Sequence, residues 1–110
     1  MQNITNILLE FSIKNNLWAL SKKEAIASLD KYFEETKSET LFKFRGLNSK
    51  DFILDEKSQE LIFWQSDHET FIIKTTLSLF IRSSPKFEIG EYSLEVGENA
   101  EIEDSWLYFH

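Results

Sequence analysis

The spacing of hydrophobic residues changes along the chain, and this change constrains the fold more than any other feature. In the first third, apolar side chains recur every three or four residues, as at Ile4, Ile7, Leu8 and Phe11, which is the period of a helix with one buried face. From about residue 41 onward they recur at every second residue, the period of a strand. Because helices come first and strands follow, the sequence predicts an α+β fold.

The helical part is expected to form two helices, over residues 3–16 and 22–36. The Asn15-Asn16 pair favours turns and should end the first helix. Ser21 and Glu24 have the spacing of a capping box, so the second helix is expected to begin directly after Ser21. Its buried stripe is predicted to consist of Ala25, Ile26, Leu29 and Phe33.

The remainder predicts an antiparallel meander of about five to six strands, running from about residue 40 to the C-terminus, with the helical pair over one face. The clearest strand is 71–81, whose odd positions are apolar and should face the core together with the helical stripe. A turn is expected around Lys57, and a turn or bulge at Gly90-Glu91 would explain a change of phase there. The other expected strands lie at 41–45, 52–54, 61–64, 92–96 and 106–109.

Length and cysteine content restrict the class of protein. A chain of 110 residues is the size of a single domain, here 1–110. It has no cysteine, which excludes disulfides and thiolate metal sites and favours a reducing, cytoplasmic compartment. Its start lacks the pattern of a signal peptide, and its longest apolar run, 61–64, is too short to cross a bilayer.

No motif in the sequence indicates a reaction. The two histidines are His68, in an Asp67-His68-Glu69 run that is expected to form a turn, and His110, which is expected to lie in a frayed end. The glycines are isolated, so a phosphate-binding loop is not expected, and no nucleophile elbow occurs. We therefore predict no enzyme activity and no catalytic, cofactor-binding or metal-binding residues.

Charge is distributed unevenly along the chain. The formal net charge is −7, with +2 in residues 1–50 and −9 in residues 51–110, and no Lys or Arg follows Lys86. Such an acidic segment repels nucleic acid and anionic membranes and attracts basic proteins. Nearby aromatic residues could act as binding anchors. The predicted partner-binding residues are Glu91, Tyr92, Glu95, Glu98, Glu101, Glu103, Asp104, Trp106 and Tyr108.

A small, acidic, aromatic-rich α+β chain without cysteine resembles the immunity proteins of bacterial toxin–immunity systems, including those of contact-dependent growth inhibition. The resemblance covers size, charge and layout. It implies a cytoplasmic inhibitor that binds and neutralises a cognate, basic toxin domain of the nuclease type, with the acidic segment as a phosphate surrogate. A non-catalytic adaptor or small-ligand-binding domain, with a pocket between helices and sheet, remains the alternative, and an enzyme ranks third.

Overall fold

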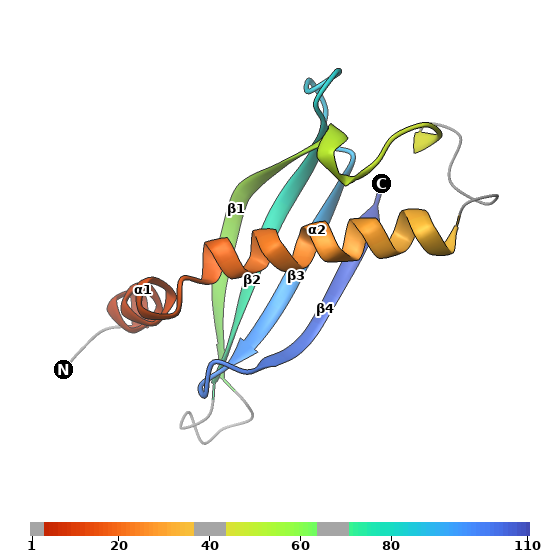
Figure 1. Cartoon of the computed structure of the whole chain (residues 1–110). Coiled ribbons are helices and arrows are strands. Elements are labelled where there is room, and N and C mark those ends of the chain that lie inside the picture. The colour runs from red at the N-terminus through yellow and green to blue at the C-terminus, as the bar shows by residue number, and fades with distance from the viewer. Residues whose placement is uncertain (1–3, 37–43, 64–70) are drawn as a thin grey trace.

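The computed structural model describes residues 4–36, 44–63 and 71–110, and Figure 1 shows their arrangement. Helix α2 lies across one face of a four-stranded sheet, and α1 precedes it at one end. The predicted α+β class is confirmed. No helix within these ranges is long and apolar enough to cross a membrane. The elements are α1 (Ile4–Asn15), α2 (Leu17–Glu35), the 3₁₀ turn η2 (Ser49–Asp51), β1 (Phe52–Phe63), β2 (Phe71–Ile81), β3 (Gly90–Gly97) and β4 (Ile102–Phe109).

The sheet is the predicted antiparallel meander, with the strands adjacent in the order β1-β2-β3-β4. Within the described residues it has four strands rather than five to six, because the segments 52–54 and 61–63 belong to one strand. The turn expected around Lys57 is instead a β-bulge: Glu56 lies opposite Leu77, and Ser58 lies opposite Thr76. A bulge accommodates one additional residue without ending the strand, so the charged run was wrongly interpreted as a turn.

Three further expectations have different outcomes. Residues 41–43 of the predicted strand 41–45, and the predicted turn Asp67-His68-Glu69, lie outside the described residues. Arg45 and Gly46 form a turn, in which Gly46 has a φ of +83° that glycine tolerates best. The change of phase at Gly90-Glu91 is neither a bulge nor a turn within a strand, because β3 begins at Gly90.

The core lies between α2 and the sheet. Leu29 of α2 and Ile73, Leu77 and Leu79 of β2 are fully buried, as predicted. Ile26, however, is 45% exposed, because α2 begins at Leu17 and its fully buried stripe runs at intervals of four residues from that position. That stripe is Leu17, Ser21, Ala25 and Leu29.

The two helices are separated at Asn16, which adopts the left-handed conformation (φ 50°, ψ 53°) that asparagine tolerates better than most residues. The predicted break is therefore confirmed, but the predicted capping box is wrong. Ser21 lies inside α2 and is fully buried, and its hydroxyl has no hydrogen-bond partner among the described residues. A single left-handed residue thus replaces the longer interruption that the sequence suggested.

Helix α1 is attached to the sheet by few contacts. Gln59 Nε2 of β1 donates hydrogen bonds to Ser12 Oγ, at 2.8 Å, and to Thr75 Oγ1, at 3.3 Å. The rings of Phe11 and Phe71 meet edge to face, with 5.4 Å between centroids.

At the other end of α2, aromatic rings from α2, Phe44, β1 and β4 close the core. The ring centroids of Phe44 and Phe109 are 4.7 Å apart.

Candidate functional site on the helix-free face of the sheet

The face of the sheet opposite α2 carries no described helix (Figure 1). Directly opposed residues of antiparallel strands share a face, so the register assigns each side chain to one side. We call this surface the open face. Its strand side chains are Ile53, Asp55, Lys57, Ser58, Glu60 and Ile62 of β1, Ile72, Lys74, Thr76, Ser78 and Phe80 of β2, Glu91, Ser93 and Glu95 of β3, and Asp104, Trp106 and Tyr108 of β4.

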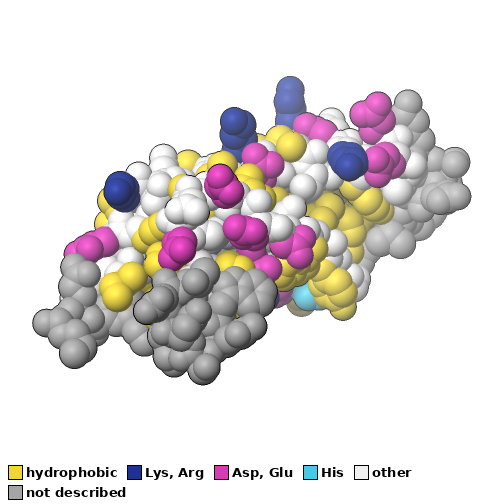
Figure 2. All heavy atoms as spheres, turned by 90° about the horizontal axis from the view of Figure 1, so that it is seen from below, with side chains coloured by type: hydrophobic (Ala, Val, Ile, Leu, Met, Phe, Trp, Pro, Cys, Tyr) yellow, Lys and Arg dark blue, Asp and Glu magenta, His cyan; other side chains and the backbone are white. Residues whose placement is uncertain are grey.

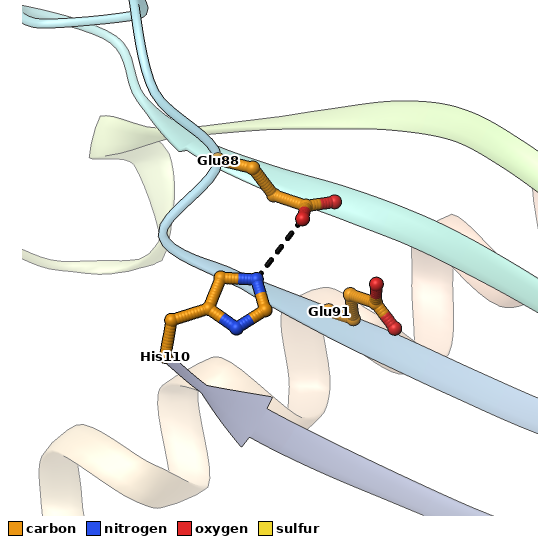
Figure 3. A group of neighbouring side chains, drawn as sticks. All are labelled: Glu88, Glu91 and His110. Carbon is orange, nitrogen blue, oxygen red and sulfur yellow. Dashed lines mark hydrogen bonds and ion pairs between the residues drawn. The ribbon is translucent and has the colours of Figure 1, made fainter.

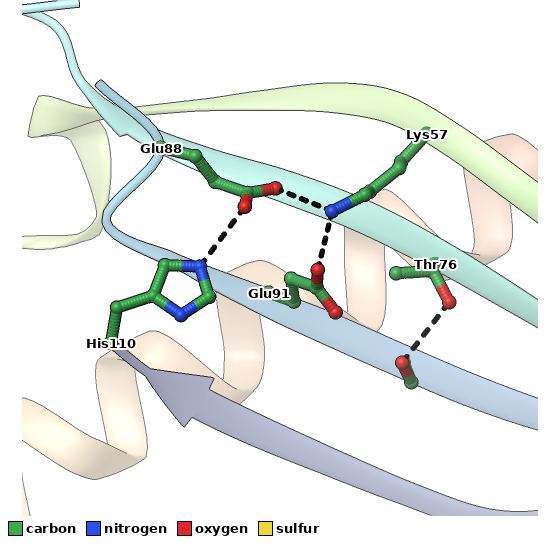
Figure 4. A network of polar contacts seen from close by, with 6 residues as sticks. Lys57, Thr76, Glu88, Glu91 and His110 are labelled. Carbon is green, nitrogen blue, oxygen red and sulfur yellow. Dashed lines mark hydrogen bonds and ion pairs between the residues drawn. The ribbon is translucent and has the colours of Figure 1, made fainter.

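Small hydroxyl side chains occupy the centre of the open face. Thr76, Ser78 and Ser93 are buried although no described helix covers them, since longer side chains surround them in the sheet. Thr76 Oγ1 and Ser93 Oγ lie 3.2 Å apart and share a hydrogen bond (Figure 4). The centre of the open face therefore consists of short polar side chains, and longer charged and aromatic side chains surround it.

An ion-pair network lies beside these hydroxyls, as Figure 4 shows. The bulge in β1 places Lys57 on the open face, where its ammonium donates to Glu88 Oε1 at 3.0 Å and also to Glu91 Oε1. His110 Nε2 lies 3.0 Å from Glu88 Oε2, and a carboxylate can only accept, so the ring nitrogen donates. His110 is therefore not the frayed end that the sequence suggested.

The network changes the acidity of its members. The pKa of Glu88 is lowered from 4.5 to about 2, chiefly by a hydrogen bond from Ser78 and further by His110 and Lys57, against the opposing effect of burial. The pKa of Lys57 is raised, first by its hydrogen bond to Glu91 and then by that to Glu88. Glu88 and Lys57 are thus held in their charged forms, which fixes two opposite charges at this corner of the open face.

Three side chains of this network also lie close enough together to bind one metal ion. Ligand atoms of Glu88, Glu91 and His110 all lie within 4.8 Å of one another (Figure 3). The ammonium of Lys57 contacts both carboxylates and supplies the positive charge that a metal ion would bring. The negative charge of the two carboxylates is therefore compensated by Lys57, and the sequence-based prediction of no metal site is kept here.

Two of the three predicted aromatic anchors lie on the open face. Trp106 is 39% exposed and Tyr108 is 58% exposed, and the ammonium of Lys74 lies 5.0 Å from the centroid of the Trp106 ring. Tyr92 is only 1% exposed, because its position in β3 alternates with that of Glu91 and points toward α2. The expectation that Tyr92 contacts a partner is therefore wrong.

The predicted acidic residues separate into two groups. Glu91, Glu95 and Asp104 project from the open face. Glu103 is the additional residue of a bulge in β4, and its carboxylate reaches over Gly97, where Glu103 Oε1 lies 2.7 Å from the position that a Cβ on that glycine would take. Glu98 and Glu101 lie in the turn between β3 and β4, where Glu98 lines an open hollow of about 510 Å³ beside α1 rather than the open face.

Negative charge is concentrated on the sheet and not on the helices. Within α1 and α2, five carboxylates face four lysines, which leaves the helices nearly neutral. The open face with Glu88 carries six carboxylates and two lysines: Asp55, Glu60, Glu88, Glu91, Glu95 and Asp104, with Lys57 and Lys74. Figure 2, seen from below, shows acidic side chains across the middle of the molecule and basic side chains (Lys or Arg) along its upper side.

Sequence reasoning missed Lys57, Glu88 and His110 as members of one cluster. They come from a bulge, a loop and the end of the chain, so no sequence spacing joins them. The only available signal was that Lys57 is an isolated base in an acidic half.

The chain was compared with protein-family models, with curated proteins and with solved structures, and none of them matches.

Proposed function

We propose that this protein is an inhibitor of the immunity type, which binds a basic toxin domain through the open face and neutralises it. The observation that carries the proposal is an acidic, helix-free sheet surface with two exposed aromatic residues, Trp106 and Tyr108. Aromatic side chains of this kind supply much of the binding energy in protein interfaces. The cytoplasm is the proposed location, because the chain contains no cysteine.

The two lysines of the open face do not cancel its attraction for a basic partner. Lys57 is bound by two carboxylates of the network, and Lys74 lies against the Trp106 ring. Glu95 and Asp104 lie opposite each other on neighbouring strands, so two like charges are held close together. Lys74 lies opposite Glu95 on the other neighbouring strand and offsets part of this repulsion, and a cation supplied by a partner would offset more of it.

The proposed mechanism is occlusion of the toxin's substrate site. Enzymes that cut nucleic acid bind phosphates with Lys and Arg, and a surface of carboxylates can occupy the same positions. The negative surface also accelerates the encounter, an effect that is strong at low salt and is screened as the Debye length falls from about 10 Å at 0.1 M to about 3 Å at 1 M.

The test is co-expression with the product of the gene directly upstream, followed by kinetics on the purified pair. Glu95→Lys with Asp104→Lys should slow association by about tenfold or more at low salt, and the difference should shrink at high salt. The matched control is Asp30→Lys with Glu34→Lys on α2, which changes the net charge equally and should alter association by less than about threefold.

Either of two results would contradict the proposal. The first is an upstream product that neither binds this protein nor is inhibited by it. The second is equal slowing by the open-face pair and the α2 pair, which would show that only the net charge matters. Circular dichroism of both variants verifies that they remain folded. Asp30, Glu34 and Asp104 are exposed and Glu95 is half-buried, so we expect the substitutions to change stability little.

A second function, small-ligand binding, is favoured by one observation. A hollow of about 370 Å³ lies between α2 and β4, lined by groups that include Tyr32, Leu107 and Phe109. Its volume is within the usual range of about 300–1,000 Å³ for ligand sites, although it is open to solvent. A compound that raises the melting temperature of the protein, but not that of Ser28→Trp, in which the hollow is filled, would favour this function.

A further inference from the structure

Strand β4 is an edge of the sheet, and its register shows which backbone groups face outward. The His110 N–H donates to the Ile89 carbonyl at 3.1 Å, and bonded and non-bonded residue pairs alternate along an antiparallel ladder. The backbone N–H and C=O groups of Trp106 and Tyr108 therefore form hydrogen bonds with β3, whereas those of Leu107 and Phe109 point away from the sheet. Within the described ranges, no other strand pairs with them.

A hydrogen bond to the side chain of Asp104 agrees with this alternation of inward and outward backbone groups. Ser105 alternates with Asp104 and should also present its N–H outward, and that N–H donates to Asp104 Oδ1 at 2.8 Å. The first outward donor of β4 is thus satisfied locally. The donors of Leu107 and Phe109 have no hydrogen-bond partner among the described residues, so we take them as available for an additional strand.

The two edges of the sheet differ in how they are protected. β1 has a bulge at Lys57 in its middle, within the charged run Asp55-Glu56-Lys57, and both features disfavour further pairing. In β4 the bulge lies near the beginning, at Glu103, so Asp104–Phe109 forms a regular ladder without Pro or Lys. The remainder of β4, 105–109, therefore lacks the bulges, Pro and charged side chains that keep an edge strand from pairing.

The two sides of β4 favour different side chains in an added strand. On the open face, Asp104, Trp106 and Tyr108 offer a carboxylate and two aromatic rings, which favour Arg or Lys. On the other side, Leu107 and Phe109 border the 370 Å³ hollow against α2, which can accept an apolar side chain. Because side chains alternate along a strand, both sides are matched by a segment in which basic and apolar residues alternate.

We propose that β4 binds an extended segment of the partner as a fifth, antiparallel strand, with basic residues on the open-face side and apolar residues toward α2. This inference deepens the proposed function and rests on it, since it names how the basic partner is held. Main-chain hydrogen bonds to an edge provide affinity in this binding mode, and alternate side-chain positions provide specificity. A second copy of this chain, with a net charge of −7, would meet like charge instead.

The probe is a capped peptide of alternating Arg and Val with eight residues, the length of β4. In an antiparallel pair, opposed residues share a face, so the peptide residues that bond to Leu107 carry the valine side chains. N-methylation of the valine amides should weaken binding by about tenfold or more, whereas N-methylation of the arginine amides should change it by less than about threefold. Backbone amide chemical shifts of Leu107 and Phe109 report the contact.

Equal effects of the two methylation patterns would overturn the proposal, because an edge strand bonds to only one of the two alternating sets. A protein variant gives an independent measurement. Ser28→Trp fills the hollow and should weaken peptide binding, whereas the matched control Ala27→Trp, on the neighbouring exposed position of α2, should not. A dimer of the free protein with shifted amides at Leu107 and Phe109 would overturn the proposal in favour of a second copy.

The peptide and the whole partner separate this inference from the proposed function. If the upstream gene product binds and depends on Glu95 and Asp104, but the peptide shows no preference between methylation patterns, only the fifth strand is refuted. If the peptide binds at Leu107 as expected and the upstream gene product does not bind, only the proposed inhibitor function is refuted.

Discussion

The substitution Glu88→Gln removes one negative charge from the ion-pair network of the open face and preserves the size of the side chain. Wild-type Glu88 receives hydrogen bonds from Ser78, His110 and Lys57, which together hold its pKa at about 2 instead of 4.5. An amide cannot replace the charge that these donors favour. We therefore expect the variant to be less stable at neutral pH.

The size of the effect follows from the pKa of Glu88. Each pKa unit corresponds to about 1.4 kcal/mol, so a fall from 4.5 to about 2 corresponds to at most about 3.5 kcal/mol. Since 26% of the Glu88 side chain remains exposed, solvent screens part of the interaction, and we expect a loss of about 2 kcal/mol at pH 7. Because folding lowers the pKa, this stabilisation is complete above pH 4.5 and is lost as the pH falls toward 2.

Urea unfolding of the wild type and Glu88→Gln between pH 2 and pH 7 measures this difference. The two proteins should differ by about 2 kcal/mol at pH 7, and most of this difference should be lost near pH 2, where wild-type Glu88 is half protonated. Glu34→Gln on the exposed surface of α2 serves as the control and should change stability by less than about 0.5 kcal/mol. A difference that stays constant down to pH 2, or is absent at pH 7, would refute the role of the ionised network.

Three further predictions concern stability and can be measured by chemical unfolding. Ser21→Ala should stabilise the protein by about 0.5–1 kcal/mol, because Ser21 is an unsatisfied residue inside α2, whereas removal of a capping serine would cost about 1 kcal/mol. Tyr92→Phe should be neutral or stabilising by about 1 kcal/mol, since the buried hydroxyl has no partner among the described residues, and a clear loss would reveal a bonded hydroxyl. Gly90→Ala should cost about 2 kcal/mol or more, because its Cβ would lie 2.4 Å from the Tyr108 carbonyl oxygen, whereas Gly97→Ala meets only the flexible end of a glutamate and should cost less.

Periodicity predicted the elements whose pattern is continuous. β2 was predicted with its observed bounds, since its odd positions are apolar over the whole strand. The strand at 106–109 and the break between the helices were also predicted correctly. The pattern failed at Lys57, where one additional residue changes which face each side chain occupies without ending the strand. Local spacing cannot distinguish a bulge from a turn, because only the partner strand defines the register.

The candidate site was predicted only in part, for a related reason. Acidic residues of β3 and β4 were identified because they are close together in the sequence. Tyr92 was included as an anchor because it lies among them, although its alternation with Glu91 places it on the buried side. The base that balances these acids, Lys57, comes from β1, which is two strands away from β3. Contacts of this kind depend on tertiary structure, so charge counted along the chain overestimates the charge that a partner meets.

The left-handed residue Asn16 has a consequence for local stability. It separates α1 from α2, and Ser12 is the only side chain of α1 in the fully buried class among those described. Leu9 and Ile13 are exposed, and Leu8 and Phe11 are only partly buried against the core, so unfolding of α1 alone would remove less apolar contact from the core than unfolding of α2. Segments with few buried contacts open without global unfolding. The amides of α1 should therefore exchange with solvent through an opening of their own, well before those of α2 and β2, so that the protein behaves as two cooperative units of unequal stability.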